Sequence, residues 1–158
     1  MENIKGLDVK KKQYRINSYT VELVRDASIV ADSRKADEPS KVAEIFRSFI
    51  GNTDREIFAA ILTDSRNKVI GINQVSVGTL SSSLVHPREV FKPAILACAA
   101  AIIVAHNHPS GDATPSPEDK VATRRIKEAG ELLGIPLLDH VILGENFFSF
   151  REQGLLNY

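Results

Sequence analysis

Apolar residues along this chain follow two patterns, one with helical spacing and one of short continuous runs. Between Pro39 and Ile50 the apolar side chains recur at three- and four-residue intervals behind an initial proline, which indicates an amphipathic helix. Every residue from Ala99 to Ala105 is apolar, which is typical of a buried strand. The same reasoning predicts, in order, a strand over Tyr14–Val24, a helix over Pro39–Ile50, strands over Ile57–Leu62 and Val69–Val77, a helix over Pro87–Ala100, a strand over Ile102–His106, a helix over Pro117–Leu133, and strands over Leu137–Leu143 and Phe147–Phe150.

This order of elements predicts an α/β fold with a mixed central sheet flanked by helices. Residues 1–37 are expected to form an N-terminal extension that contains the strand over Tyr14–Val24, and residues 38–158 to form the main domain. Pro93 lies inside the helix predicted over Pro87–Ala100, and because proline lacks a backbone N–H it is expected to kink or split that helix.

Composition narrows the classes of function. The chain has 158 residues, the size of one domain, and its 20 basic and 20 acidic residues cancel. Because strong non-specific binding of nucleic acid depends on many basic side chains, we expect weak or no DNA binding. The single cysteine, Cys98, cannot form an internal disulfide, which fits a cytoplasmic protein, and its apolar surroundings predict a buried side chain. No apolar run approaches the roughly 18 residues of a membrane span and no signal peptide opens the chain, so we expect no membrane association.

Two histidines stand at the end of the most apolar predicted strand, in the stretch HNHPSGDATPSPED. On a strand, His106 and His108 share one face, with their backbones roughly 6–7 Å apart. Pro109 ends the strand, and Asp119 lies in the first turn of the helix that follows. Two imidazoles and one carboxylate are the ligand set of a catalytic zinc site whose fourth position is open to water.

A simpler interpretation of the same residues needs no metal. Ser116 fits the helix N-cap and Pro117 the first helical position, and Asp119, three residues past the cap, then completes a variant of the capping box. His106 and His108 are equally compatible with a polar turn. The combination nevertheless favours metal binding. Four polar residues fall within fourteen positions, between a buried strand and the first turn of a helix that begins with acidic residues: His106, His108, Ser116 and Asp119.

The motif resembles that of the JAMM (MPN+) metalloproteases, His-x-His-Pro-x6-Ser-x2-Asp, with His106, His108, Ser116 and Asp119 in its fixed positions. With VHPREVFKPAI upstream and LLDHVIL downstream, the chain from about residue 38 to 158 looks like the RadC branch of that family. The resemblance implies an MPN/JAB-like fold, similar to that of cytidine deaminases, one Zn²⁺ per chain, and hydrolysis of peptide or isopeptide bonds. RadC proteins typically carry an N-terminal helix-hairpin-helix region, and only some 35 residues precede the similar segment, so we expect a short form without it.

Such hydrolysis needs a carboxylate near the zinc that takes a proton from water and passes it to the leaving amine. Three glutamates are candidates: Glu118 beside a ligand, Glu89 at a helix start that favours acids, and Glu56 at the entrance to an apolar strand. In the JAMM family the base is a glutamate that opens a strand in the position of Glu56, so the resemblance favours Glu56, with Glu89 second. The resemblance also assigns Ser116 to stabilising the oxyanion.

Other functions compete with this one. Zinc deaminases require a pair of cysteines that this chain lacks. A DNA repair or recombination accessory of the RadC type, without proteolytic activity, is the main alternative, and a catalytically silent scaffold ranks last because all ligands are present. His86 is expected to cap a helix or line a loop, and His140 to be a structural residue with a possible role behind the metal ligands. The expected partner is a protein or peptide substrate, and the pattern indicates no particular oligomeric state.

Overall fold

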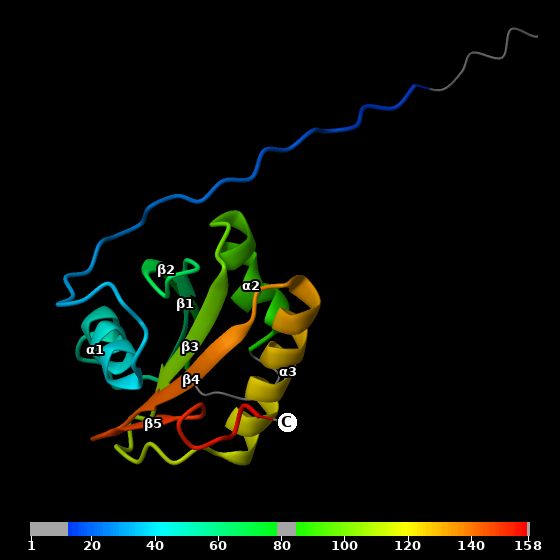
Figure 1. The fold of residues 1–158 in the computed structure, drawn as a ribbon. Coiled ribbons are helices and arrows are strands. Elements are labelled where there is room, and N and C mark those ends of the chain that lie inside the picture. The colour runs from blue at the N-terminus through cyan, green and yellow to red at the C-terminus, as the bar shows by residue number, and fades with distance from the viewer. Residues whose placement is uncertain (1–12, 79–84, 158) are drawn as a thin grey trace, which may run out of the picture.

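The computed structural model describes residues 13–78 and 85–157, which form eight elements of secondary structure (Figure 1). In chain order these are α1 (Pro39–Ile50), β1 (Ile57–Thr63), β2 (Val69–Val77), α2 (Pro87–Leu96), β3 (Ala101–Asn107), α3 (Pro117–Leu133), β4 (Leu137–Leu143) and β5 (Phe147–Ser149). No helix among the described residues is long and apolar enough to cross a membrane.

The strands form a single mixed sheet in the order β2-β1-β3-β4-β5. β3 and β4 are parallel and are joined through α3, as the crossover between parallel neighbours requires, whereas the other neighbouring strands are antiparallel. Phe58 on β1 lies opposite His106 on β3 in the antiparallel register. The start of β1 and the end of β3 therefore meet at the same edge of the sheet.

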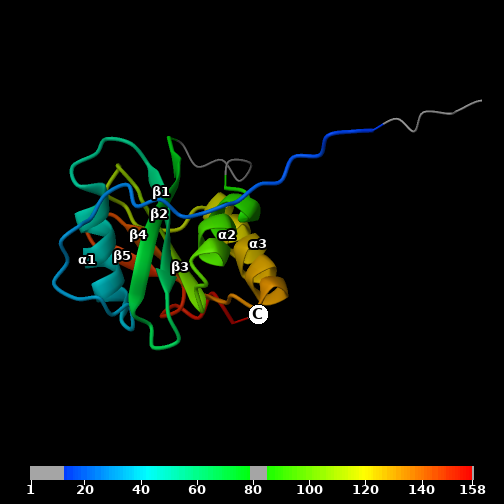
Figure 2. The same cartoon turned by 90° about the horizontal axis from the view of Figure 1, so that it is seen from above.

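Helices cover both faces of the sheet, with α1 on one side and α2 and α3 on the other (Figures 1 and 2). Every residue of the central strands β1 and β3 is buried. This burial on two faces explains why both strands are continuous apolar runs in the sequence instead of alternating patterns. The predicted α/β architecture, a mixed sheet flanked by helices, is confirmed.

The boundaries of α1 and α3 match those predicted, because each helix carries local start or stop signals. Both begin with proline at the first helical position. α3 is capped by Ser116 at its start and by Gly134 after its last residue, and the φ of 71° at Gly134 is a left-handed conformation that favours glycine.

The strand predicted over Tyr14–Val24 is wrong. Residues 13–31 lie in no helix or strand, and Tyr14, Ile16 and Tyr19 are 74%, 92% and 82% exposed. The alternating pattern favours an extended backbone, but a strand also needs a partner, and pairing in this region is limited to a bridge between Lys35 and Lys68. The segment trails away from the domain in Figure 1.

The helix predicted over Pro87–Ala100 ends earlier, at Leu96, and Cys98 is exposed instead of buried. The Cys98 N–H donates to the carbonyl of Ile95, and the Ala99 N–H donates to that of Ala94. These two bonds form a Schellman motif, in which Cys98 takes the left-handed conformation at φ 50°. Because glycine usually occupies that position, the sequence carries no obvious stop signal here.

Candidate metal centre

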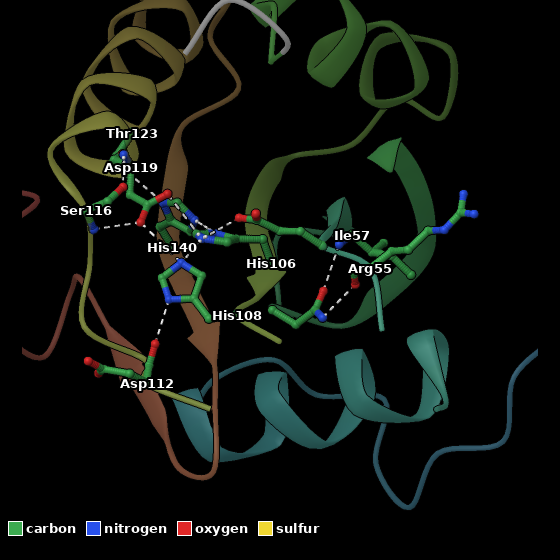
Figure 3. A network of polar contacts seen from close by, with 11 residues as sticks. Arg55, Ile57, His106, His108, Asp112, Ser116, Asp119, Thr123 and His140 are labelled. Carbon is green, nitrogen blue, oxygen red and sulfur yellow. Dashed lines mark hydrogen bonds and ion pairs between the residues drawn. The ribbon is translucent and has the colours of Figure 1, made fainter. Parts of the chain in front are cut away.

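Four side chains converge where β1 begins and β3 ends, three of them from one stretch of fourteen residues and one from about fifty residues earlier. Ligand atoms of Glu56, His106, His108 and Asp119 all lie within 4.8 Å of one another. His106 Nε2 lies 3.0 Å from His108 Nε2, 3.2 Å from Asp119 Oδ1 and 3.8 Å from Glu56 Oε1. His108 Nε2 lies 3.4 Å from Asp119 Oδ2. Figure 3 shows both imidazoles and the Asp119 carboxylate turned toward one another.

The loop after β3 is fixed against the turn between β4 and β5. The backbone N–H of His108 donates to the carbonyl of Leu143 at 2.7 Å, and that of Glu145 donates to the carbonyl of Gly111 at 2.8 Å. Gly144 lies between these bonds, where a Cβ would collide with the backbone of Gly111. A glycine is therefore needed for the close approach that holds His108 beside His106.

The position of Asp119 is compatible with both interpretations of the sequence, a metal ligand and a capping-box residue of α3. The complete capping box is present, because Ser116 Oγ accepts from the Asp119 N–H and Asp119 Oδ2 accepts from the Ser116 N–H at 2.8 Å. The same carboxylate faces His106 and His108. Burial raises the pKa of Asp119, but contacts with His106 and Ser116 outweigh burial and hold that pKa well below its ordinary range. Asp119 is therefore an anion at neutral pH.

Each histidine of the pair is held through the ring nitrogen that faces away from the cluster. Nδ1–H of His108 donates to the backbone carbonyl of Asp112 at 2.7 Å, because a carbonyl only accepts, and in a neutral ring this leaves the lone pair on Nε2. His106 Nδ1 contacts Nε2 of the fully buried His140 at 2.7 Å. Burial, reinforced by His106, holds the pKa of His140 well below its ordinary value, so His140 is neutral.

The donor set fits a divalent metal ion. Ligand atoms bonded to one tetrahedral zinc at about 2.0–2.1 Å are separated by roughly 3.3 Å. The three contacts among His106, His108 and Asp119 span 3.0–3.4 Å. Two imidazole nitrogens and a carboxylate are also a ligand combination that zinc takes in catalytic sites.

Glu56 is held at the site through the residues on either side of it. Asn107 Oδ1 accepts from the buried backbone N–H of Ile57 at 2.7 Å, and Asn107 Nδ2 donates to the carbonyl of Arg55 at 2.9 Å. The residue between the two histidines thus clamps the segment that carries Glu56. Sequence reasoning missed this role, because the partners lie about fifty residues apart.

The other candidate residues lie elsewhere. Glu89 is half-exposed and pairs with Lys92 at 2.7 Å, and this hydrogen bond lowers the pKa of Glu89. Glu118 is exposed and lies outside the group of converging ligand atoms. His86 caps α2 by accepting from the Arg88 N–H at 3.1 Å, as expected.

A mixed sheet flanked by helices, with two histidines at a strand end facing an aspartate at a helix start, is the arrangement of a JAB/MPN-type domain. The profile of the "RadC-like JAB domain" matches residues 36–155, and the chain belongs to this family. It is 46% identical over 158 residues to a UPF0758 protein of Rubrobacter xylanophilus, covering 99% of this chain and 69% of the relative. It is 54% identical over 119 residues to one of Moorella thermoacetica, covering 75% of this chain and 52% of the relative.

Proposed function

We propose that this chain is a zinc-dependent hydrolase of the JAMM type that cleaves peptide or isopeptide bonds. One zinc ion per chain would be held by His106, His108 and Asp119. The observation that carries the proposal is the convergence of two imidazole nitrogens and an anionic carboxylate at 3.0–3.4 Å, with a second carboxylate, Glu56, 3.8 Å from His106. Membership of the JAB family supports it.

A zinc ion at these ligands would polarise a carbonyl and lower the pKa of water toward 7. Glu56, whose side chain is 18% exposed and lies 3.8 Å from His106, would take a proton from water and later donate it to the leaving amine. Ser116 Oγ accepts from the Asp119 N–H, and a side-chain hydrogen bond between Ser116 and the Asp119 carboxylate helps to lower the pKa of Asp119. With a metal ion bound to that carboxylate, the Ser116 hydroxyl would donate to a developing oxyanion instead.

The proposed partner is a protein or peptide, with DNA binding weak or absent. Twenty basic and twenty acidic residues leave no net charge to attract phosphates. The RadC name of the family fits the alternative of a DNA repair accessory. Fluorescence titration with duplex DNA at about 150 mM salt separates the two, because a sub-micromolar Kd, tighter than the typical non-specific range, would favour the alternative.

The metal ligands are tested first. Purified protein should carry about one zinc per chain by elemental analysis, and His106→Ala and His108→Ala should each lose most of it, because a three-ligand site tolerates the loss of a ligand poorly. Full zinc retention in both variants would rule out the metal site and leave only the capping role of Asp119.

The base is tested with Glu56→Gln and the matched control Glu89→Gln, using a panel of fluorogenic peptides with peptide and lysine isopeptide bonds. Glu56→Gln should keep zinc and the melting temperature but lose at least about a hundredfold in kcat/KM, since general acid–base groups contribute about 10²- to 10⁴-fold. Glu89→Gln should retain activity. The reverse result, with zinc intact in both, would move the base to Glu89.

A further inference from the structure

A buried chain of hydrogen bonds leads from the backbone of α3 to the imidazole of His106. Thr123 Oγ1 lies 2.6 Å from the carbonyl oxygen of Asp119 and 2.6 Å from His140 Nδ1. His140 Nε2 lies 2.7 Å from His106 Nδ1. The side chains of Thr123, His140 and His106 are all fully buried, so water cannot substitute for any partner in the chain. Figure 3 shows Thr123 beside Asp119 on α3, with His140 between Thr123 and His106.

The direction of every hydrogen bond in this series follows from the backbone carbonyl of Asp119, which can only accept a hydrogen bond. The carbonyl of Asp119 has no hydrogen to give, so the single hydroxyl hydrogen of Thr123 is donated to that carbonyl. Thr123 Oγ1 must then accept from Nδ1–H of His140. A neutral imidazole carries one N–H, so Nε2 of His140 is an acceptor and receives the Nδ1–H of His106.

We infer that Thr123 and His140 are positioning residues that select the tautomer of His106 able to bind metal. With its hydrogen on Nδ1, His106 keeps Nε2 as the atom that would bind a metal ion shared with His108 and Asp119, whose ligand atoms lie 3.0 Å and 3.2 Å away. His108 reaches the same state more simply, through the carbonyl of Asp112. The inference rests on the proposed metal site for its purpose, but Thr123 and His140 set the hydrogen on Nδ1 of His106 in the metal-free protein too, whichever cation lies on the Nε2 side beside Asp119.

Removing the Thr123 hydroxyl should reverse the chain. In Thr123→Val, a His140 with its hydrogen on Nδ1 would bury an unpaired donor, which is unfavourable. Moving that hydrogen to Nε2 relieves the problem, and His140 then donates to Nδ1 of His106. His106 must in turn carry its own hydrogen on Nε2, the atom that faces the metal site. Zinc affinity should fall by about tenfold or more, as expected when a group that orients a metal-binding histidine is lost.

Two control variants isolate the hydroxyl. Thr123→Ser keeps the hydroxyl and should keep the wild-type tautomers and zinc affinity. Thr63→Val removes a second buried threonine hydroxyl that also donates to a backbone carbonyl, that of Ala101, at the opposite end of β1. It should lower stability without changing the tautomer of His106 or the affinity for zinc.

The experiment measures ring ¹⁵N chemical shifts of histidine-labelled, metal-free protein at about pH 8, above the ordinary histidine pKa. Wild type should show the hydrogen on Nδ1 in both His106 and His140, whereas Thr123→Val should show it on Nε2 in both. Zinc affinity of the same proteins is then measured by chelator competition. Wild-type His140 with its hydrogen on Nε2 overturns the inference even if Thr123→Val fails to fold.

The zinc titration has its own decisive outcomes. Wild-type affinity in Thr123→Val, with His106 still protonated on Nδ1, overturns the inference. Loss of affinity in Thr63→Val equal to that in Thr123→Val also overturns it, because the effect would then be one of general stability. If wild-type protein binds no zinc, the proposed function fails, while the ¹⁵N spectrum still decides the tautomers.

Discussion

Asn107 offers the sharpest test of how the fold supports the site, because its amide makes two bonds to the segment that carries Glu56. In Asn107→Ala the buried N–H of Ile57 loses its acceptor, the Asn107 Oδ1 that lies 2.7 Å away in the wild type. A buried donor without a partner costs about 1–3 kcal/mol. The carbonyl of Arg55 is more accessible, since Arg55 is exposed, and its lost bond costs about 1 kcal/mol or less. Asn107→Ala should therefore lose about 1–4 kcal/mol of unfolding free energy.

Urea denaturation of metal-free protein measures this loss, with Asn73→Ala as the control. Asn73 is an exposed asparagine on β2 of the same sheet, and its replacement should change stability by about 0.5 kcal/mol or less. Asn107→Ala should also lower kcat with little change in zinc affinity, because the amide holds Glu56 and not the metal ligands. A stability equal to that of Asn73→Ala, or a zinc loss as large as that of His108→Ala, would refute the clamp.

Three further predictions follow from the same geometry. Asp119→Asn should keep the helix but reduce zinc affinity by more than the roughly 10–100-fold that outer residues cost, as chelator competition can measure; unchanged affinity would remove Asp119 from the ligand set. Since unfolded His140 takes up a proton near pH 6.5 and folded His140 does not, metal-free protein should lose stability as pH falls below 6.5, by up to about 1.4 kcal/mol per unit. Urea midpoints should show this slope in wild type and a smaller one in His140→Gln; equal slopes would contradict it. Gly144→Ala should cost about 3 kcal/mol and weaken zinc binding, because its Cβ meets the neighbouring loop, whereas Gly71→Ala, with its nearest neighbour 3.7 Å away, should change the melting temperature little.

Elements with local signals were predicted well, and those that depend on distant partners were not. α3 combines a serine cap, a proline at its first position and a glycine at its end, so its limits follow from the residues themselves. The segment Tyr14–Val24 has the composition of a strand, but strand formation depends on an edge to pair with, which composition does not reveal. Cys98 ends α2 in a conformation that its residue type does not favour, and only the hydrogen-bonding pattern explains it.

The residues of the candidate site also differ in whether local sequence or distant strand pairing brings them together. His106, His108 and Asp119 could be grouped from the sequence because one strand, one turn and one helix start span only fourteen positions. Glu56 was selected through family resemblance, since nothing local shows that β1 runs antiparallel to β3 and brings its first residues to the end of that strand.

Sequence reasoning named His140 as a structural residue and offered a role behind the metal ligands as an option, but it missed Thr123 and the hydrogen bonds that join the two, for a physical reason. A ligand motif is local in sequence, because the metal needs several donors held by neighbouring, rigid elements of structure. The side chains that orient those donors, in contrast, can come from any element that packs against these elements. Thr123 lies one helical turn after Asp119, and His140 lies opposite Val104 in the parallel register between β3 and β4. A histidine in an apolar strand of such a sheet must have its ring nitrogens satisfied by neighbouring elements. Here those neighbours are a metal-site histidine and the first turns of the helix that carries the third ligand, so packing and chemistry depend on the same bonds.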